Sequence, residues 1–362
     1  MSICRKCILN LKPYVPGKPI EEVKRELGID DVIKLASNEN PFGPSPKAVE
    51  AIKNYAEQIS LYPDGSCFDL RKELANHLGV EPDMLIFGAG GDEVIFYLGM
   101  AFLEDGDEVV QADPNFAEYK AAATIMDCRT NMVPLQNWTH DLDAMLEKVN
   151  EHTKIFVITN PNNPTGTLVS ADDVERVLDA LPERCILFLD EAYYEYVDDP
   201  KYTRSVQWAK EGRNVLALRT FSKVYGLAGL RVGYGIGPKH IIESMERVRA
   251  PFNVNSVAQV AAIASLNDQN QVKRSREQNN RSKEYLYKEL DTMGVAYTPT
   301  QANFLWVDTG QDCKKVFSDL MKLGVIVRTG DIFDCPTHIR VTTGTDEQNE
   351  RFINTLRQVL GL

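Results

Sequence analysis

The stretch RTFSKVYGLAGLRVG, residues 219–233, sets one lysine, Lys223, between hydroxyl residues and ahead of a run of glycines. The apolar segment before it, residues 214–218, predicts a buried strand, and the glycine-rich part predicts a loop. A lysine held in a loop at a strand end loses part of its hydration, which lowers its pKa and makes its amine nucleophilic. The pattern therefore favours a Schiff-base lysine, with an ordinary surface lysine in a glycine-rich loop as the alternative.

Hydroxyl and guanidinium groups lie close to Lys223 in the sequence. Thr220 and Ser222 precede it, and Arg231 follows in the same loop. A planar guanidinium can bind a phosphate through two parallel hydrogen bonds, and hydroxyl groups can donate further ones. These three residues therefore predict a phosphate site beside the lysine.

Length and charge narrow the class of protein. The 362 residues suit one large domain with a smaller one, and 43% hydrophobic with 25% charged residues is ordinary for a globular protein. The net charge of −12 argues against a nucleic-acid partner and against an anionic membrane surface. We see no apolar run close to the roughly 20 residues that span a bilayer, and no secretory signal. Small anionic substrates stay possible, because a local cluster of arginines can attract an anion despite the net negative charge of the chain.

The seven cysteines are scattered and odd in number, which fits a reducing cytoplasm better than a disulfide framework. Cys4 and Cys7 form a CxxC pair. A structural zinc site needs a second pair at a compatible spacing, and the sequence has none. We therefore expect no metal site.

Apolar runs of strand length alternate with helix-like segments from residue 84 onward. The predicted strands are 84–87, 108–111, 155–159, 186–189, 215–218 and 232–236, and the predicted helices are 92–102, 117–126, 171–181 and 239–249. The strands are continuously apolar, as strands covered on both faces are. The alternation predicts parallel βαβ units, whose functional sites form beyond the carboxyl ends of the strands.

The predicted fold class is α/β, with a large domain whose mostly parallel sheet is flanked by helices. We assign this domain to residues 31–252. Residues 1–30 read as an N-terminal arm, proline-rich at 12–19 and helical at 20–27. After residue 252 short strands are grouped with helices, which predicts a smaller α+β domain at 253–362.

A glycine turn follows the first predicted strand. Gly88-Ala89-Gly90-Gly91-Asp92-Glu93 leads from that strand into a helix, where free backbone N–H groups and the helix dipole favour an anion. The turn lacks the Lys-Ser/Thr of a nucleotide-binding P-loop. The alternative is a tight strand–helix turn capped by Asp92.

Other polar or aromatic residues follow the remaining strands. Asp190 ends an apolar strand, where a carboxylate is costly to bury without a cationic partner such as a protonated ring nitrogen. Alternatively, Asp190 caps the next segment. Tyr193 and Asn163 offer directed hydrogen bonds, and Phe116 offers a ring that can stack on a flat group. Together with the lysine and the phosphate site, this set matches what pyridoxal phosphate requires.

Seven motifs then carry a resemblance along essentially the whole chain. They are SNENPFGPSP (37–46), YPDG (62–65), GGDE (90–93), NPNNPTG (160–166), DEAYYEY (190–196), TFSKVYGLAGLRVGY (220–234) and RVTTG (340–344). In this order they resemble the fold-type I pyridoxal-phosphate aminotransferases, and more closely the histidinol-phosphate aminotransferase family. The match to the fold and cofactor is the more specific part, and the match to the substrate is weaker.

The resemblance implies a role for each matching residue. Lys223 would hold the cofactor covalently and shuttle a proton, and Asp190 would pair with the pyridine nitrogen. Tyr193 and Asn163 would bind the phenolic oxygen, and Phe116 would stack on the ring. The remaining implied roles are phosphate binding by Gly91, Asp92, Ser222 and Arg231 with support from Thr220, a contact to the phosphate across a dimer interface by Tyr62, and substrate binding by Tyr14, Asn38, Arg328 and Arg340. Relatives often have serine or alanine in place of Gly91 and tyrosine in place of Phe116.

The implied reaction is transamination between L-histidinol phosphate and 2-oxoglutarate, giving 3-(imidazol-4-yl)-2-oxopropyl phosphate and L-glutamate. The resemblance also implies a cytoplasmic homodimer with shared active sites. Two arginines suit both substrates, because a guanidinium fits a carboxylate and a phosphate alike. The alternatives on the same fold are an aromatic amino-acid aminotransferase, a threonine-phosphate decarboxylase, another lyase, or a non-catalytic regulator.

Overall fold

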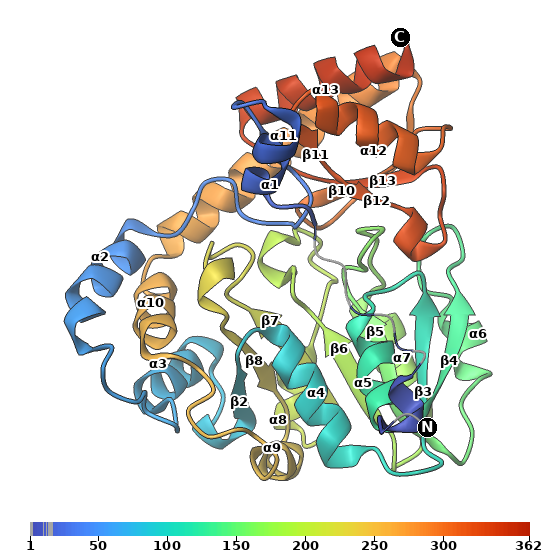
Figure 1. Ribbon diagram of the computed structural model, residues 1–362. Helices are drawn as coiled ribbons and strands as arrows, with labels where there is room; N and C mark the ends of the chain where they lie inside the picture. Colours follow the sequence, from blue (N-terminus) through green and yellow to red (C-terminus); the bar gives the residue numbers. More distant parts are fainter. Residues whose placement is uncertain (1–2, 10, 12, 14–16) are drawn as a thin grey trace.

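A seven-stranded sheet forms the centre of the computed structural model, which describes residues 3–9, 11, 13 and 17–362. The strand order is β2-β8-β7-β6-β5-β3-β4 (Figure 1). The strands are β2 (Leu85–Gly88), β3 (Glu108–Asp113), β4 (Arg129–Pro134), β5 (Thr153–Thr159), β6 (Ile186–Asp190), β7 (Val215–Thr220) and β8 (Gly233–Ile236). The α/β class with a mostly parallel sheet is therefore confirmed.

Two features of this sheet differ from the prediction. Strand β8 is antiparallel to both of its neighbours, β2 and β7. The segment joining β7 to β8 holds only the short 3-10 helix η5 (Ala228–Leu230), and a parallel strand needs a longer crossover. Strand β4 was not predicted, because this outer strand is polar and only half-buried.

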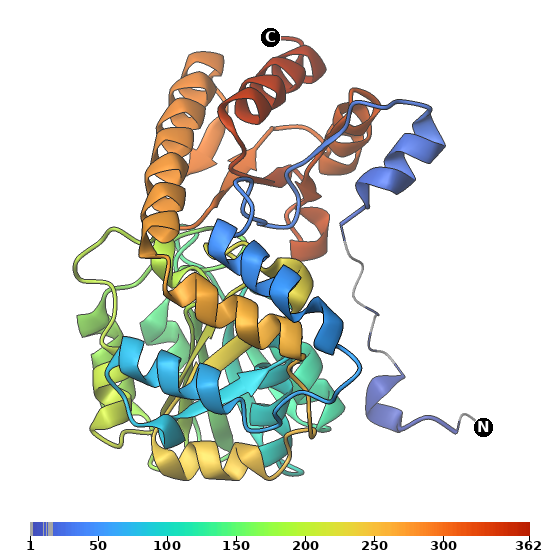
Figure 2. The same cartoon turned by 90° about the vertical axis from the view of Figure 1, so that its left-hand side faces the viewer.

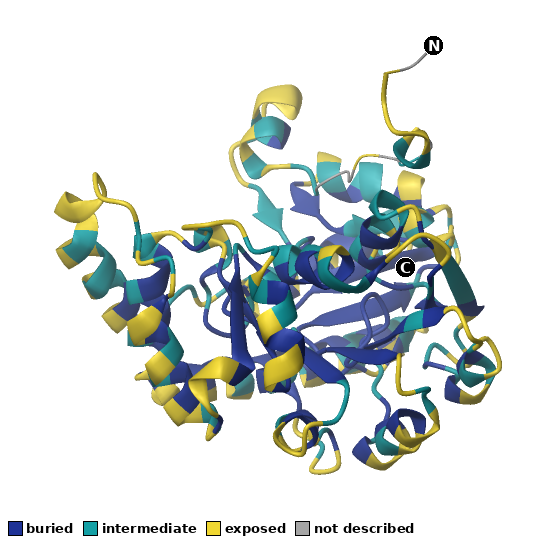
Figure 3. Cartoon of the chain, turned by 90° about the horizontal axis from the view of Figure 1, so that it is seen from below, coloured by how far each residue is buried: buried dark blue, intermediate teal, exposed yellow. Residues whose placement is uncertain are grey.

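Helices cover both faces of the sheet, and successive side chains of each strand point to opposite faces. Phe188 packs with the helices of one face and Leu189 with those of the other. Figure 3 shows the buried strands between helices whose outer sides are exposed. On the first face lie α4 (Gly91–Phe102), α5 (Glu118–Ile125) and α9 (Lys239–Glu246); on the second lie α2 (Pro46–Tyr55), α3 (Phe68–Leu78), α6 (Leu142–Leu146), α7 (Ala171–Ala180), α8 (Ser205–Lys210) and α10 (Ser256–Leu266).

A second, four-stranded sheet has the order β12-β13-β10-β9. It shares a core with three helices, and Figure 2 shows the longest of them, α11, rising from the level of α10 to lie beside α13. Helix α13 begins with a capping box between Thr345 and Gln348. The elements are β9 (Ala296–Thr298), β10 (Phe304–Asp308), β12 (Arg328–Thr329), β13 (His338–Thr342), α11 (Gln269–Met293), α12 (Cys313–Lys322) and α13 (Asp346–Leu360).

The packing bears on the predicted domain limits, 1–30, 31–252 and 253–362, which stay a prediction. Helix α10 packs against α2 and α3, and its Ala258 and Ala261 belong to the core of the large sheet. At the other end, β1 (Ile33–Lys34) pairs with β11 (Val325–Ile326) beside the small sheet. The packing therefore favours a boundary at the start of α11, with the segment around β1 joining the smaller unit.

The arm is described in part. Helix α1 (Ile20–Leu27) packs through Val23 against Ala36 and Ile326, and the short helix η1 (Lys6–Ile8) lies against α5. Among the helices of the described residues, none is both long and apolar enough to cross a membrane.

Candidate active site

The predicted site residues gather at the carboxyl ends of β6 and β7, as expected for a sheet of this type. Asp190 is the last residue of β6, and Lys223 follows the end of β7 by three residues. The amino end of α4 lies at the same edge of the sheet, because Gly91 borders Gly233 at the start of β8. Arg340 in β13 approaches from the small sheet and hydrogen-bonds Asn163.

The side chain of Lys223 is half-buried beside the end of β7. Its Nζ lies 3.4 Å from the carbonyl oxygen of Ser37, to which it donates, and 5.6 Å from the centre of the Tyr193 ring. Burial, followed by the nearby charge of Arg340, lowers the pKa of Lys223 to about 8. A substantial fraction of the amine is therefore neutral near neutral pH, which a nucleophilic lysine requires.

The carboxylate of Asp190 is buried and accepts two hydrogen bonds. One comes from the hydroxyl of Tyr119, and the other comes from the N–H of Ala192 at 2.9 Å. Burial raises the pKa of Asp190 to about 6, and no ion pair joins this carboxylate to a basic side chain of the described residues. The carboxylate is thus arranged to receive a cation from a ligand.

Tyr119 is a site residue that the sequence reasoning missed. Its hydroxyl contacts Asp190, and its ring lies edge-on to Phe116 at 5.7 Å between centroids. Thr159 at the end of β5 donates to the same hydroxyl at 3.1 Å. Helical spacing gave no signal for Tyr119, because Phe116 precedes α5 (Glu118–Ile125) and the contact with Asp190 joins residues 71 positions apart.

A cradle for an anion lies between the amino end of α4 and Arg231. The guanidinium of Arg231 donates to Asp92 Oδ2 at 3.2 Å. Gly90 has a φ of +88°, and an added Cβ would lie 2.3 Å from Arg231 Nη2, so any side chain there would displace the guanidinium. Gly91 opens the helix with a free N–H, as an anion site at a helix start requires.

Hydroxyl groups border this cradle at the end of β7. The N–H of Ser222 donates to Thr220 Oγ1 at 3.1 Å, and Thr220 Oγ1 lies 3.4 Å from the carbonyl oxygen of Val232. Both residues are buried. Thr220 therefore fixes the backbone that presents Ser222.

One hydrogen-bond network joins the two sheets across the site. Asn38 Nδ2 donates to the hydroxyl of Tyr193 at 2.9 Å, and Thr342 in β13 accepts from the Asn38 N–H at 2.9 Å. Arg340 donates to Asn163 Oδ1 and, at 2.9 Å, to the carbonyl oxygen of Ala36. The network positions the phenol of Tyr193 and the buried guanidinium of Arg340, both of which lie near Lys223.

The three predicted residues that remain are Arg328, Tyr62 and Tyr14. Arg328 is paired with Arg340 across β12 and β13, so the two side chains point to the same face of the small sheet. Tyr62 is 83% exposed and stacks on Phe252 at 5.0 Å between centroids, and not on the side chains described above. Tyr14 lies outside the described residues.

The chain matches known proteins over almost its full length. Residues 30–356 match the family Aminotransferase class I and II. The histidinol-phosphate aminotransferase of Moorella thermoacetica is 52% identical over 99% of this chain and 93% of that protein, and the enzyme of the same name from Caldicellulosiruptor saccharolyticus is 47% identical over 98% and 99%. The chain belongs to the histidinol-phosphate aminotransferase family.

Solved structures agree with this family assignment. The histidinol-phosphate aminotransferase of Sinorhizobium meliloti in complex with pyridoxal-5'-phosphate has a TM-score of 0.92 at 29% identity, covering 100% of this chain and 98% of that one. An L-threonine-O-3-phosphate decarboxylase from Porphyromonas gingivalis has a TM-score of 0.81 at 21% identity, covering 91% of this chain and 100% of that one. The second likeness shows a shared fold alone. The resemblance drawn from the motifs is therefore confirmed.

Proposed function

We propose that this member of the histidinol-phosphate aminotransferase family catalyses pyridoxal-phosphate-dependent transamination between L-histidinol phosphate and 2-oxoglutarate. The products are 3-(imidazol-4-yl)-2-oxopropyl phosphate and L-glutamate. The proposal rests on two residues at adjacent strand ends: Lys223, whose pKa is lowered, and the buried Asp190, whose pKa is raised. The names of relatives that are 52% and 47% identical support the choice of substrate.

The residues present fit pyridoxal phosphate. Asp190 is buried with hydrogen-bond donors but no basic partner among the described side chains, which suits a protonated ring nitrogen. The cradle at Gly90, Gly91 and Arg231 suits a phosphate, and Phe116 offers a ring at the same strand edge. When bound, this group supplies an electron sink that stabilises negative charge at the Cα atom of the substrate.

The protein's own residues then supply the proton transfer and the orientation. The Lys223 amine is placed to hold the cofactor and to move a proton at the substrate Cα. The Tyr193 hydroxyl, held by Asn38, and the Asn163 amide, held by Arg340, are placed to donate to an oxygen of the cofactor ring. Tyr119 positions Asp190 without touching the reacting atoms.

Two arginines on the small sheet account for two dissimilar anionic substrates. Arg340 and Arg328 point to one face, and the charge of Arg340 already lowers the pKa of Lys223. A guanidinium binds either a carboxylate or a phosphate in a bidentate manner. The same pair therefore serves glutamate in one half-reaction and histidinol phosphate in the other.

A homodimer with shared active sites is part of the proposal. Large apolar side chains are exposed near Tyr62, including Ile59 at 68%, Leu61 at 67% and Phe68 at 64%. Such a patch marks an interaction surface, and a second copy would cover it and bring Tyr62 to the partner's phosphate cradle. We also propose a cytoplasmic location, supported by seven cysteines that are all free thiols.

Substrate kinetics test the choice of reaction. With 2-oxoglutarate as acceptor, we expect kcat/KM for L-histidinol phosphate to exceed that for L-phenylalanine by at least about a hundredfold, because phenylalanine has no phosphate to accept hydrogen bonds from the arginines. A preference for phenylalanine, or release of carbon dioxide from O-phospho-L-threonine, would contradict the proposal. Arg340→Lys should lower kcat/KM for both substrates, because lysine lacks the bidentate fork.

A further inference from the structure

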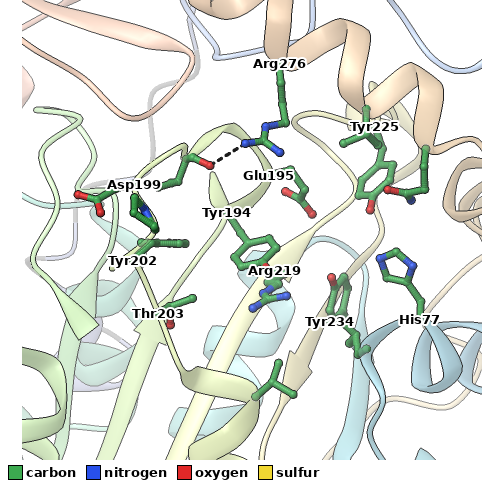
Figure 4. Close-up of a pocket in the computed structure, with 16 residues that line it drawn as sticks. His77, Tyr194, Glu195, Asp199, Tyr202, Thr203, Arg219, Tyr225, Tyr234 and Arg276 are labelled. Atoms are coloured by element: carbon green, nitrogen blue, oxygen red, sulfur yellow. Dashed lines mark hydrogen bonds between the residues drawn. The ribbon is translucent and has the colours of Figure 1, made fainter. Parts of the chain in front are cut away.

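A second cavity, of about 590 Å³, lies on the other side of the sheet from α4. Figure 4 shows its lining side chains, which come from α3, the 3-10 helix η4 (Tyr194–Tyr196) and the segment after it, β7, the loop between β7 and β8, β8 and α11. Lys223, Asp190 and Arg340 do not line it. The cavity is therefore separate from the site described above, although it begins one residue after Tyr193.

Strand alternation explains why charged residues reach this side. Asp190 and Thr220 end β6 and β7 and serve the catalytic edge. Arg219, the neighbour of Thr220, points the opposite way and lines the second cavity, and it pairs there with Glu191, the residue after Asp190. Adjacent residues at these strand ends thus face opposite sides of the sheet.

Arg219 lines the cavity and forms a buried ion pair with Glu191. Its Nε donates to Glu191 Oε2 at 2.8 Å, and its guanidinium lies 3.4 Å from the centre of the Tyr194 ring. Glu191 also accepts from Ser205 at 2.9 Å and from Thr203 at 2.6 Å. The carboxylate of Glu191 is therefore fully partnered, and the guanidinium of Arg219 is held by Glu191, by Ser205 at 3.3 Å and by the Tyr194 ring.

Glu195, in contrast, is a buried carboxylate with an unused oxygen. Only 9% of the residue is exposed, and its Oε2 finds no hydrogen-bond partner among the described residues. Burial raises the pKa of Glu195 to about 7. A buried carboxylate oxygen without a donor is costly, and a ligand that donates there would remove this cost.

Arg276 supplies the complementary charge. It extends from α11 over the cavity and donates to the carbonyl oxygen of Val197 at 3.1 Å (Figure 4). No carboxylate of the described residues forms an ion pair with Arg276, so most of its N–H groups stay available. The rings of Tyr225 and Tyr234 also line the cavity.

We propose that this cavity binds a free α-amino acid with a planar side chain. The ammonium group would donate to Glu195, the carboxylate would accept from Arg276, and the ring would lie against Tyr225 and Tyr234. A simple anion would leave Glu195 beside a like charge, and a simple cation would leave Arg276 unmatched. The volume lies within the range of small-molecule sites and exceeds that of one amino acid, which leaves room for bridging water.

The position of the site gives such binding a consequence. Glu195 follows Tyr193 by two residues, and Arg276 stands near the start of α11, which continues into the small sheet. A ligand held by both Glu195 and Arg276 would therefore link the segment after β6, at the catalytic site, to α11, which packs against the small sheet.

Calorimetric titration of the cofactor-loaded full-length protein tests the proposal. L-histidine, L-phenylalanine and L-tyrosine are the probes, and the visible spectrum of the cofactor is recorded on the same samples. We expect at least one probe to give saturable heat without a spectral change, since the site lies away from the cofactor. Glu195→Gln and Arg276→Gln should each weaken this binding at least about tenfold.

Glu277→Gln is the matched control, because Glu277 is an exposed residue of the same helix turn. It should bind the probe as the wild type does. Glu195→Gln should fold normally, because no hydrogen bond of Oε2 is lost. The proposal is overturned if no probe binds without a spectral change at concentrations up to about 10 mM, or if Glu195→Gln binds as tightly as the control.

Hydrogen exchange provides the second readout. The probe should protect residues 194–197 and the first turns of α11, and Glu195→Gln should abolish that protection. Protection confined to the segment around Lys223 would place the probe in the catalytic site and would also overturn the proposal. Neither result depends on which substrate the enzyme uses.

Discussion

The residues at the ends of β6 and β7 carry buried charges on both sides of the sheet, and the two sides treat these charges in opposite ways. On one face Asp190 is buried without a basic partner, and the pKa of Lys223 is lowered to about 8. On the other face Glu191 and Arg219 are buried as a matched pair. Unmatched charge lowers stability and is kept where a ligand will complete it, whereas matched charge holds the strand ends together.

The largest effect should come from Lys223→Ala. Loss of the amine removes both the covalent hold on the cofactor and the proton transfer, so turnover of histidinol phosphate should fall at least about a thousandfold. Lys223→Arg is the control, because it keeps a positive charge without a nucleophilic amine and should be as inactive. Activity within about tenfold of the wild type would break the comparison, because the unmatched lysine would then have no catalytic role.

Glu191→Gln tests the opposite face. This change leaves the buried guanidinium of Arg219 without its carboxylate, which should cost about 3 to 5 kcal/mol of the unfolding free energy. Urea denaturation of the cofactor-free protein at pH 7 measures this cost. A loss below about 1 kcal/mol would show that the pair does not hold the strand ends.

Asp190→Asn should change stability in the opposite direction to Glu191→Gln and should also lower activity. Activity should fall about a hundredfold, because a neutral amide cannot keep the ring nitrogen of the cofactor protonated. The folded pKa of Asp190, about 6, lies above its unfolded value of about 3.9, so the folded protein loses stability as pH rises from about 4 to 6. The variant should therefore be more stable than the wild type at pH 7, by about 3 kcal/mol, when both are free of cofactor.

The pH dependence of cofactor capture sharpens the account of Lys223. Because burial lowers its pKa to about 8, the fraction of neutral amine grows as pH rises through that value. The rate at which cofactor-free protein binds pyridoxal phosphate covalently should rise from pH 6 to 9, with a midpoint near 8. Stopped-flow absorbance measures this rate, and a midpoint near 10 would show that the lysine is not desolvated.

The smallest effect should come from Tyr62→Phe, which tests the shared site. Loss of one hydroxyl contact to a phosphate should weaken cofactor binding by about fivefold to tenfold, and the loss should depend on dimer formation. Tyr285→Phe, in the core beside the small sheet, is the control and should change nothing. An active monomer on dilution would contradict the role of Tyr62.

The parts that the sequence predicted depend on local pattern. The continuous apolar runs gave the strands, and the residues after them, Asp190 and Lys223 among them, meet at one edge because parallel strands end together. The glycine turn before α4 was equally local, because Gly90 and Gly91 follow a buried strand directly.

The parts that were not predicted depend on contacts between distant segments. The hydroxyl of Tyr119 meets Asp190 across 71 positions, and α10 packs on α2 and α3 from far along the chain. Glu195 stood inside the DEAYYEY motif, but only the folded chain shows it facing Arg276 of α11 in one cavity. Neither composition nor periodicity reports which buried charge finds a partner.

The central claim is tested most directly by an absorbance spectrum of the cofactor-loaded protein before and after single additions of L-glutamate and of L-histidinol phosphate. The account predicts a visible band from the lysine-bound cofactor, which each compound removes in the absence of any acceptor, and which Lys223→Ala never shows. If glutamate or phenylalanine removes the band and histidinol phosphate does not, the assignment of substrate is contradicted. If no band forms with added pyridoxal phosphate, the role of Lys223 is contradicted, and the proposed reaction with it.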